Sequence, residues 1–223
     1  MNTSWISGNG NPGSFESCSI RTLALPFSLK LPEDLIAAKI CGRWANGSPL
    51  VQAPESQSSA DPGKWDDFDY AGDSSGLRWP WGAHIRRVNP RNDGTVRGIN
   101  FGNRRMIRRG IAYGRAFDPQ HPHDMVERGL LGYFIMASLA DQFEFVLKEW
   151  MSGGGFSGRL RSDAEDPFFP FSEGKPNDFP IPSAENPTRT LKRMPRFVTC
   201  RAIMYLFLPS LTALRHISTL GGK

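Results

Sequence analysis

The chain has 223 residues, the length of a single domain, and its 39% hydrophobic content is enough to form a buried core. Its 18 prolines and 23 glycines predict long irregular connections between the regular elements. The longest apolar run is too short to cross a bilayer, so we expect no membrane-spanning segment. The net charge of +5 at pH 7 fits nucleic acid and an enclosed anionic ligand equally well, and charge alone does not choose between them.

The three cysteines, Cys18, Cys41 and Cys200, are scattered, and no pair has the spacing of a metal site. We therefore expect reduced thiols in a cytoplasmic protein. The first 15 residues have no charged stretch followed by an apolar core, so we expect no signal peptide. Residues 1–30 are predicted to be a flexible N-terminal segment, and residues 31–223 to form the folded domain.

The first regular element is a predicted helix over residues 31–44. Pro32 and two acidic residues suit its first turn, apolar residues follow at helical spacing, and Gly42 can end it. Residues 47–75 are rich in serine, proline and aspartate, which predicts a long loop.

Two strands and two helices are predicted in the second half of the chain. Residues 128–138 form an apolar run of strand length, and the apolar residues of 139–150 recur three and four apart, which predicts an amphipathic helix. Residues 152–194 are rich in glycine and proline and are predicted to be irregular. The chain closes with a predicted strand over residues 196–208 and a helix that begins near Pro209. Because long loops separate these strand–helix pairs, we expect an α+β fold with an antiparallel sheet rather than a doubly wound parallel sheet.

Arginine is concentrated in two stretches, residues 86–97 and 104–109. A solvated basic face is the simplest interpretation. Nucleic-acid binding is a second one, but no reading helix, RNP pattern or zinc finger accompanies the arginines. An enclosed anionic ligand is the third, and the glycine, isoleucine and tryptophan residues that alternate with the arginines favour it.

The histidines leave several interpretations open. His84 can be a hydrogen-bonded structural residue, a proton shuttle, a metal ligand or an anion contact. His121 and His123 form a His-x-His pair in a proline-rich turn, but a metal site needs three or four ligands of fixed geometry. His216 lies on the predicted last helix and is interpreted as a surface or core residue.

The order and the residues of six stretches of the sequence are informative when taken together: AAKICGRWANGSPL, WGAHIRRVNPR, RRMIRRGIAYG, ERGLLGYFIMASLADQFEFVLKEW, EDPFFP and MPRFVTCRAIMYLFLPSLTAL. In that order they resemble the C-terminal half of the dye-decolorizing (DyP-type) haem peroxidases, over roughly residues 34–217. The motifs His-Ile-Arg-Arg and Arg-Arg-Gly-Ile-x-Tyr-Gly are the pair most specific to this family. The resemblance implies the ferredoxin-like half of a dimeric α+β barrel. It also implies haem b as cofactor, and hydrogen peroxide with a bulky organic reductant as substrates.

The resemblance also implies roles for single residues. In the family, the histidine of the His-Ile-Arg word is the axial ligand of haem iron, which here is His84. An acid bonded to the other ring nitrogen makes the imidazole more basic, and the matching stretch offers Asp166, with Glu165 as the second choice. The family's distal arginine corresponds to Arg108, which is expected to polarise the O–O bond of peroxide. Neighbouring arginines are expected to neutralise the haem propionates: Arg86, Arg91 and Arg109.

The sequence departs from the family at the distal aspartate of the Gly-x-x-Asp-Gly motif, which has no match here. That motif belongs to the family's first ferredoxin-like half. We therefore expect a truncated member with weak turnover, since proton transfer by such an acid contributes about 10²–10⁴-fold. A non-catalytic haem- or tetrapyrrole-binding protein is the alternative, and an arginine-rich nucleic-acid-binding protein is the third. An apolar face where the missing half would pack predicts self-association.

Overall fold

The structure of the protein is a computed structural model. It describes residues 31–57, 62–93, 96, 101–118, 120–121, 124–155, 157–161, 163–170, 172, 174–175, 177–184 and 188–220. The predicted N-terminal segment 1–30 lies outside these residues. None of the helices in the described ranges is long and apolar enough to cross a membrane.

Short helices, short strands and long connections make up the fold. The α-helices are α2 (Glu33–Cys41), α3 (His84–Val88) and α4 (Leu211–Leu220), and the π-helical segments are η5 (Leu139–Glu144) and η6 (Val146–Met151). The 3-10 turns are η2 (Pro62–Lys64), η3 (Ala71–Asp73) and η4 (Phe101–Arg104). The strands are β1 (Ile107–Tyr113), β2 (Gly129–Ile135), β3 (Phe179–Ile181) and β4 (Arg189–Leu191).

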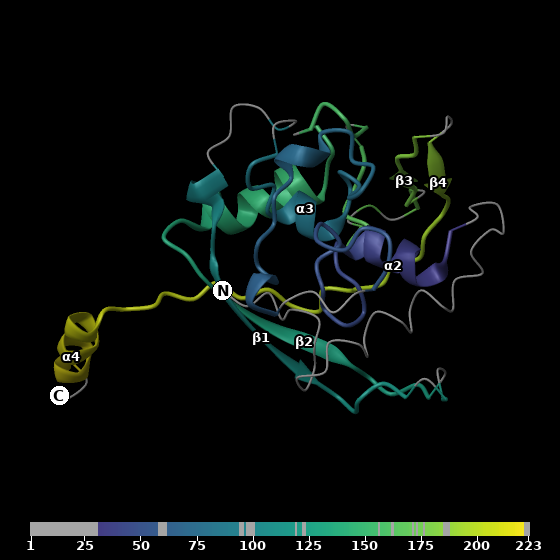
Figure 1. Ribbon diagram of the computed structural model, residues 1–223. Helices are drawn as coiled ribbons and strands as arrows, with labels where there is room; N and C mark the ends of the chain where they lie inside the picture. The colour runs from purple at the N-terminus through teal and green to yellow at the C-terminus, as the bar shows by residue number, and fades with distance from the viewer. Residues whose placement is uncertain are drawn as a thin grey trace.

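The α+β class with antiparallel pairing is confirmed. Strand β1 pairs with β2, and β3 pairs with β4, both antiparallel. These described strands form two separate two-stranded sheets, so they make up only part of a ferredoxin-like unit. Helices α2 and α3 lie in the main body near β3 and β4, the β1–β2 hairpin lies at its lower edge, and α4 stands apart (Figure 1).

Helix α2 confirms the helix predicted over residues 31–44. It ends at Gly42, which has a φ of +107° and donates its N–H to the carbonyl of Ala38. A Cβ at this position would lie 2.4 Å from the Trp79 ring, so only glycine fits both the backbone and the packing. The helix therefore ends where the sequence places a glycine.

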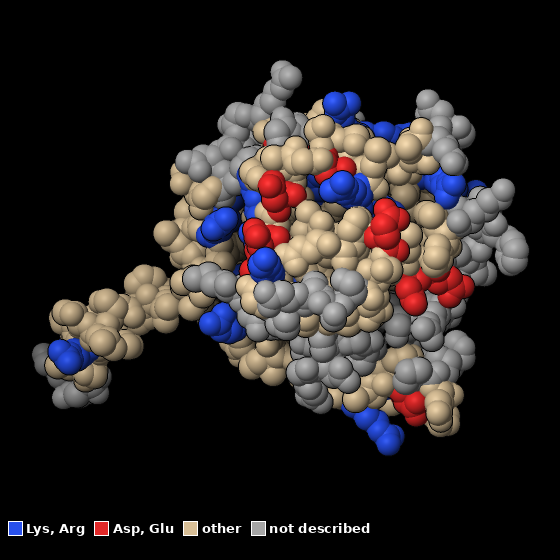
Figure 2. Space-filling view, in the orientation of Figure 1, with Lys and Arg blue, Asp and Glu red and all other residues tan. Residues whose placement is uncertain are grey.

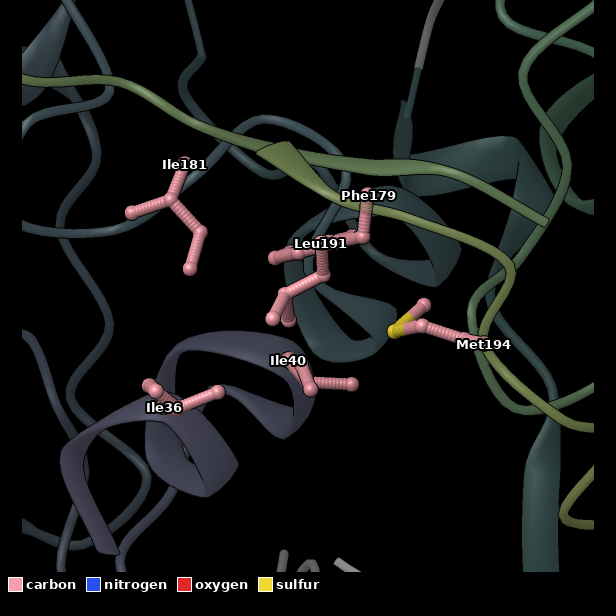
Figure 3. Packing of buried hydrophobic residues seen from close by; sticks show 6 residues of the cluster. All are labelled: Ile36, Ile40, Phe179, Ile181, Leu191 and Met194. Atoms are coloured by element: carbon pink, nitrogen blue, oxygen red, sulfur yellow. The ribbon is translucent and has the colours of Figure 1, made fainter. Parts of the chain in front are cut away.

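One apolar core joins α2 to β3 and β4. Ile36 and Ile40, one turn apart on α2, point toward the side chains of the two strands (Figure 3). The cluster consists of Ile36, Ile40, Phe179, Ile181, Leu191 and Met194, all of them buried. Burial of each such side chain stabilises the fold by about 1.5–3 kcal/mol, which fixes the position of two strands of only three residues each.

The strand and helix predicted over residues 128–150 are confirmed as β2 and the pair η5–η6. The helical part is π-helical, and it begins after Ser138, whose side chain accepts the backbone N–H of Asp141 at 3.1 Å. The arginine-rich stretch before it forms η4 and β1, which places Arg108 and Arg109 on neighbouring positions of a strand, facing opposite sides of the sheet. The described residues of the range 152–194 are mostly irregular as predicted, but they contain β3 and β4.

The strand predicted over residues 196–208 is wrong, whereas the helix after Pro209 is confirmed as α4. The segment 196–208 forms no strand in the structure, and residues 199–208 are all exposed. Its apolar and β-branched composition suits a sheet, but a strand exists only with a hydrogen-bonding partner. Parts of the segment contact the body, since Val198 donates its N–H to the carbonyl of Phe168 and Tyr205 donates its hydroxyl to Glu144. Helix α4 and the chain just before it stand away from the body and are mostly uncharged (Figure 2).

The β1–β2 hairpin exposes an apolar face. Alternate residues of the two strands share this face, and six large apolar side chains on it are each 49–58% exposed: Ile107, Ile111, Tyr113, Leu131, Tyr133 and Ile135. Arg109, opposite Tyr133, is the charged residue on the same face. A largely apolar exposed surface of this kind marks an interaction site or promotes association.

We expect the chain to self-associate through this face. Light scattering after size-exclusion chromatography should show a mass that rises with protein concentration. Ile111 and Leu131 are cross-strand partners, so the double variant Ile111→Lys with Leu131→Glu should favour the single chain while the two new charges attract across the hairpin.

The matched control exchanges the exposed ion pair Arg161–Asp163, which also leaves the net charge unchanged and should not alter the mass. A parent chain that is monomeric at every concentration would contradict this prediction.

Candidate functional site

Helix α3 presents His84 at its first position. The helix is five residues long because Pro90 follows it, and the residue before a proline is pushed toward extended backbone. Its start is held by an aromatic cluster in which the buried Trp79 ring lies 4.9 Å from Tyr70 and 5.1 Å from Phe68. The position of His84 is therefore set by apolar packing just before it in the chain.

His84 is hydrogen-bonded to Asp166 across 82 residues of sequence. Its Nδ1 lies 2.8 Å from Oδ2 of Asp166. The imidazole side chain is 29% exposed, whereas the carboxylate is completely buried. The Phe168 ring packs edge-on against the imidazole at 5.5 Å between centroids. The ring is thus fixed on one side and open to its surroundings on the other.

The Asp166 carboxylate is held from several sides. Its Oδ1 accepts the backbone N–H groups of Phe168 at 3.0 Å and Phe169 at 3.2 Å, and its own N–H donates to the carbonyl of Met151 at 2.7 Å. Burial would raise the pKa of Asp166, but the charge and hydrogen bond of His84, the charge of Arg87 and the N–H of Phe168 together hold the pKa below its usual value. Asp166 is therefore an ionised acceptor.

This pairing determines what the imidazole can do. An ionised carboxylate has no proton and can only accept a hydrogen bond, so Nδ1–H of His84 is the donor. In the neutral ring, the lone pair then resides on Nε2. A histidine that ligates a metal typically donates its other N–H to a carboxylate in this way.

Arg86, predicted to meet a haem propionate, is placed inside the fold. It is 1% exposed, and its guanidinium bonds Asp93 at 2.7 Å, Asp73 at 3.2 Å and the carbonyl of Trp79 at 2.6 Å. Its charge is balanced by two buried carboxylates. These contacts fasten α3 to the preceding loop.

The other predicted arginines lie on or near β1. Arg108 is half-buried, and its pKa is lowered by burial and, to a lesser extent, by the positive charge of Arg91. Arg91 donates to the carbonyl of Asp66 at 3.0 Å and lies over the Phe68 ring at 5.0 Å. Arg109 is exposed and donates to the carbonyl of Arg108. The positive charges of Arg91 and Arg108 repel each other, and their combined positive potential favours an anion nearby.

The remaining candidates are separate from the His84–Asp166 pair. The Glu165 carboxylate accepts the backbone N–H of Ser172 at 2.9 Å. His121 is exposed and bonds Asp118 at 2.8 Å, while His123 lies outside the described residues. Within the described part of the chain, no three histidine, cysteine or acidic residues form a group that could hold a metal ion.

Sequence reasoning missed Arg87, which is 1% exposed and lies one turn after His84. Its guanidinium donates to backbone carbonyls on both sides of the loop that leads to Asp166. The signal was present in the doubled arginine of the His-Ile-Arg-Arg motif, but the sequence does not show that both arginines turn inward.

Comparison with known proteins gives a consistent result. No protein-family profile matches the chain. The dye-decolorizing peroxidase msp1 of Mycetinis scorodonius is 30% identical to it over 203 residues, which cover 82% of this chain and 39% of that protein. A dye-decolorizing peroxidase of Exidia glandulosa is 30% identical over 199 residues, covering 84% of this chain and 38% of the relative.

Solved structures agree. A variant of the dye-decolorizing peroxidase from Pleurotus ostreatus matches with a TM-score of 0.62 and 26% identity, over 80% of this chain and 41% of that one. The chain belongs to the dye-decolorizing peroxidase family. DyP2 from Amycolatopsis sp., another dye-decolorizing peroxidase, matches with a TM-score of 0.60 and 27% identity over 74% of this chain. The chain spans about 40% of the length of the curated relatives that it matches.

In this chain, replacing Asp166 should change stability in a pH-dependent way. Asp166→Asn should lower the free energy of unfolding by about 1–3 kcal/mol at pH 7, because a buried charged hydrogen bond is lost. The unfolded chain ionises its aspartates near pKa ~3.9, above the folded pKa of Asp166. The stability from Asp166 is therefore complete above about pH 5 and is lost as the pH falls through the folded pKa.

Urea unfolding between pH 3 and pH 7 measures this difference. The gap between the parent chain and Asp166→Asn should shrink below about pH 4. Asp163→Asn is the control, because water screens this exposed carboxylate and its replacement should cost little at any pH. A gap that stays constant down to pH 3 would contradict an ionised, buried Asp166.

Proposed function

We propose that this chain binds haem b through His84 and forms the haem-carrying part of a peroxidase. The proposed enzyme uses hydrogen peroxide to oxidise dyes, phenols or other bulky reductants. The observation that carries the proposal is the 2.8 Å contact between Nδ1 of His84 and the buried Asp166 carboxylate. Membership in the dye-decolorizing peroxidase family supports it.

The residues present fit haem. A haem iron needs one axial ligand from the protein, and the partly exposed imidazole of His84 offers Nε2 while Nδ1 is held by Asp166. Asp166 orients the ring and makes it a more basic ligand, since it accepts a hydrogen bond from Nδ1–H. Bound haem supplies the two-electron reduction of peroxide and the one-electron oxidation of the reductant.

Arg108 is proposed as the residue that acts on peroxide. Guanidinium stays charged at any working pH, so Arg108 can polarise the O–O bond and stabilise the oxygen that leaves. Arg91 and Arg109 are proposed to neutralise the haem propionates. Arg86 is left out of this set, since its charge is already balanced by Asp73 and Asp93.

A non-catalytic haem-binding protein is the second candidate. The contact between His84 and Asp166 fits this candidate equally well, because it orients an iron ligand whether or not peroxide reacts there. Nucleic-acid binding has less support, because Arg86 and Arg87 are buried and add nothing to a basic surface. Acidic side chains also lie between the basic ones on the face shown in Figure 2.

The two haem-binding candidates differ in the behaviour of Arg108→Leu. With added haem, the parent chain should show a Soret band that His84→Ala abolishes. Arg108→Leu should keep the band but lose peroxide-dependent dye oxidation, by about 10²-fold or more, because the charge that stabilises the leaving oxygen is gone.

Arg105→Leu is the matched control, since Arg105 is an exposed arginine close to β1 and should keep the parent rate. If Arg108→Leu also kept the parent rate, any activity would be the generic reactivity of exposed haem. The non-catalytic candidate would then be preferred.

A further inference from the structure

Arg87 holds together the two ends of the loop over residues 152–165, which we call the neck of the loop. The side chain is buried on α3, one turn after His84. Its guanidinium donates to four backbone carbonyls, those of Trp150, Gly153, Ala164 and Glu165. Two of these acceptors lie where the loop begins and two where it ends, so one side chain ties both ends to α3.

The loop between these acceptors has little structure of its own. Among its described residues, 152–155, 157–161 and 163–165, the one ladder contact is an isolated bridge between Ser157 and Val96. Closing such a glycine-rich loop costs conformational entropy, which hydrogen bonds at its neck must offset. Asp166 is the first residue after the neck, and its N–H bonds the carbonyl of Met151 at 2.7 Å. The place of its carboxylate therefore depends on where the loop is tied.

Arg87 also acts on Asp166 through charge. Burial lowers the pKa of Arg87 to about 10, against the opposing effects of Asp166 and Glu165, so the guanidinium stays charged at neutral pH. A buried cation near a buried carboxylate stabilises the ionised form of that carboxylate. Geometry and charge thus have the same effect on the His84–Asp166 pair.

We propose that Arg87 is the positioning residue of this pair: by closing the neck of the loop it holds the Asp166 carboxylate against Nδ1 of His84. This positioning is a property of the chain itself. Its use in tuning a haem ligand rests on the proposed function, and the two are tested by separate measurements.

The test compares Arg87→Lys and Arg87→Met with Arg43→Lys in the full chain. Lysine keeps the charge but has one nitrogen, which cannot reach four carbonyls arranged around a planar fork. Arg43 is the matched control, because it is also buried and donates to loop carbonyls, those of Gly47 and Trp65, on a different part of the fold. Arg87→Lys keeps the test usable if Arg87→Met fails to fold.

The readout is the imidazole Nδ1–H of His84 in the haem-free chain, observed by nitrogen-15 NMR and assigned with His84→Gln. In the parent, this proton should resonate at low field and exchange slowly with water. Arg87→Lys should move it upfield and speed its exchange at least tenfold, while Arg43→Lys should leave both unchanged. An unchanged proton in folded Arg87→Lys, or the same change in Arg43→Lys, would overturn the proposal.

Hemin titration is the second measurement. If the parent shows a Soret band, Arg87→Lys should bind hemin at least tenfold more weakly, and parent-like binding would overturn the claimed use of this positioning. If the parent shows no Soret band, the proposed function fails, and the NMR result alone still decides whether Arg87 positions Asp166.

Discussion

The hydrogen bond between His84 and Asp166 is the contact on which the rest of the site depends. A buried carboxylate is stable only where charge and N–H groups surround it, and here His84, Arg87 and two backbone N–H groups of the 166–169 turn do so. In return, the carboxylate fixes the ring orientation and leaves Nε2 as the nitrogen that can bind a metal. One interaction therefore determines the orientation, the tautomer and the basicity of the imidazole.

The fold around this contact consists of short elements held by side chains rather than by long ladders. Helix α3 has five residues, too few to be stable alone, and it is fastened by Trp79 on one side and by two buried arginines on the other. Arg86 ties α3 to Asp73 and Asp93, and Arg87 ties it to the loop before Asp166. Arg86 and Arg87 of the His-Ile-Arg-Arg motif are thus structural, although a basic stretch would suggest a charged surface.

Periodicity and stop signals predicted α2, β2, the η5–η6 helix and α4, because these depend on neighbouring residues. They did not predict β3 and β4, whose three residues each are ordered by packing against Ile36 and Ile40. The 196–208 segment shows the opposite case, since its composition suits a strand but no strand among the described residues pairs with it. Asp166 was reached only through resemblance to a family, because no local pattern links residues 82 positions apart.

The ferric/ferrous midpoint potential of the haem-loaded chain tests the central claim most directly. If Asp166 makes the His84 imidazole a stronger ligand, Asp166→Asn should bind haem but raise the potential, since a less basic imidazole stabilises ferric iron less well. A shift of about 60 mV corresponds to a tenfold change in this one-electron equilibrium. An unchanged potential in Asp166→Asn would contradict the claim, because the carboxylate would then have no effect on the iron through His84.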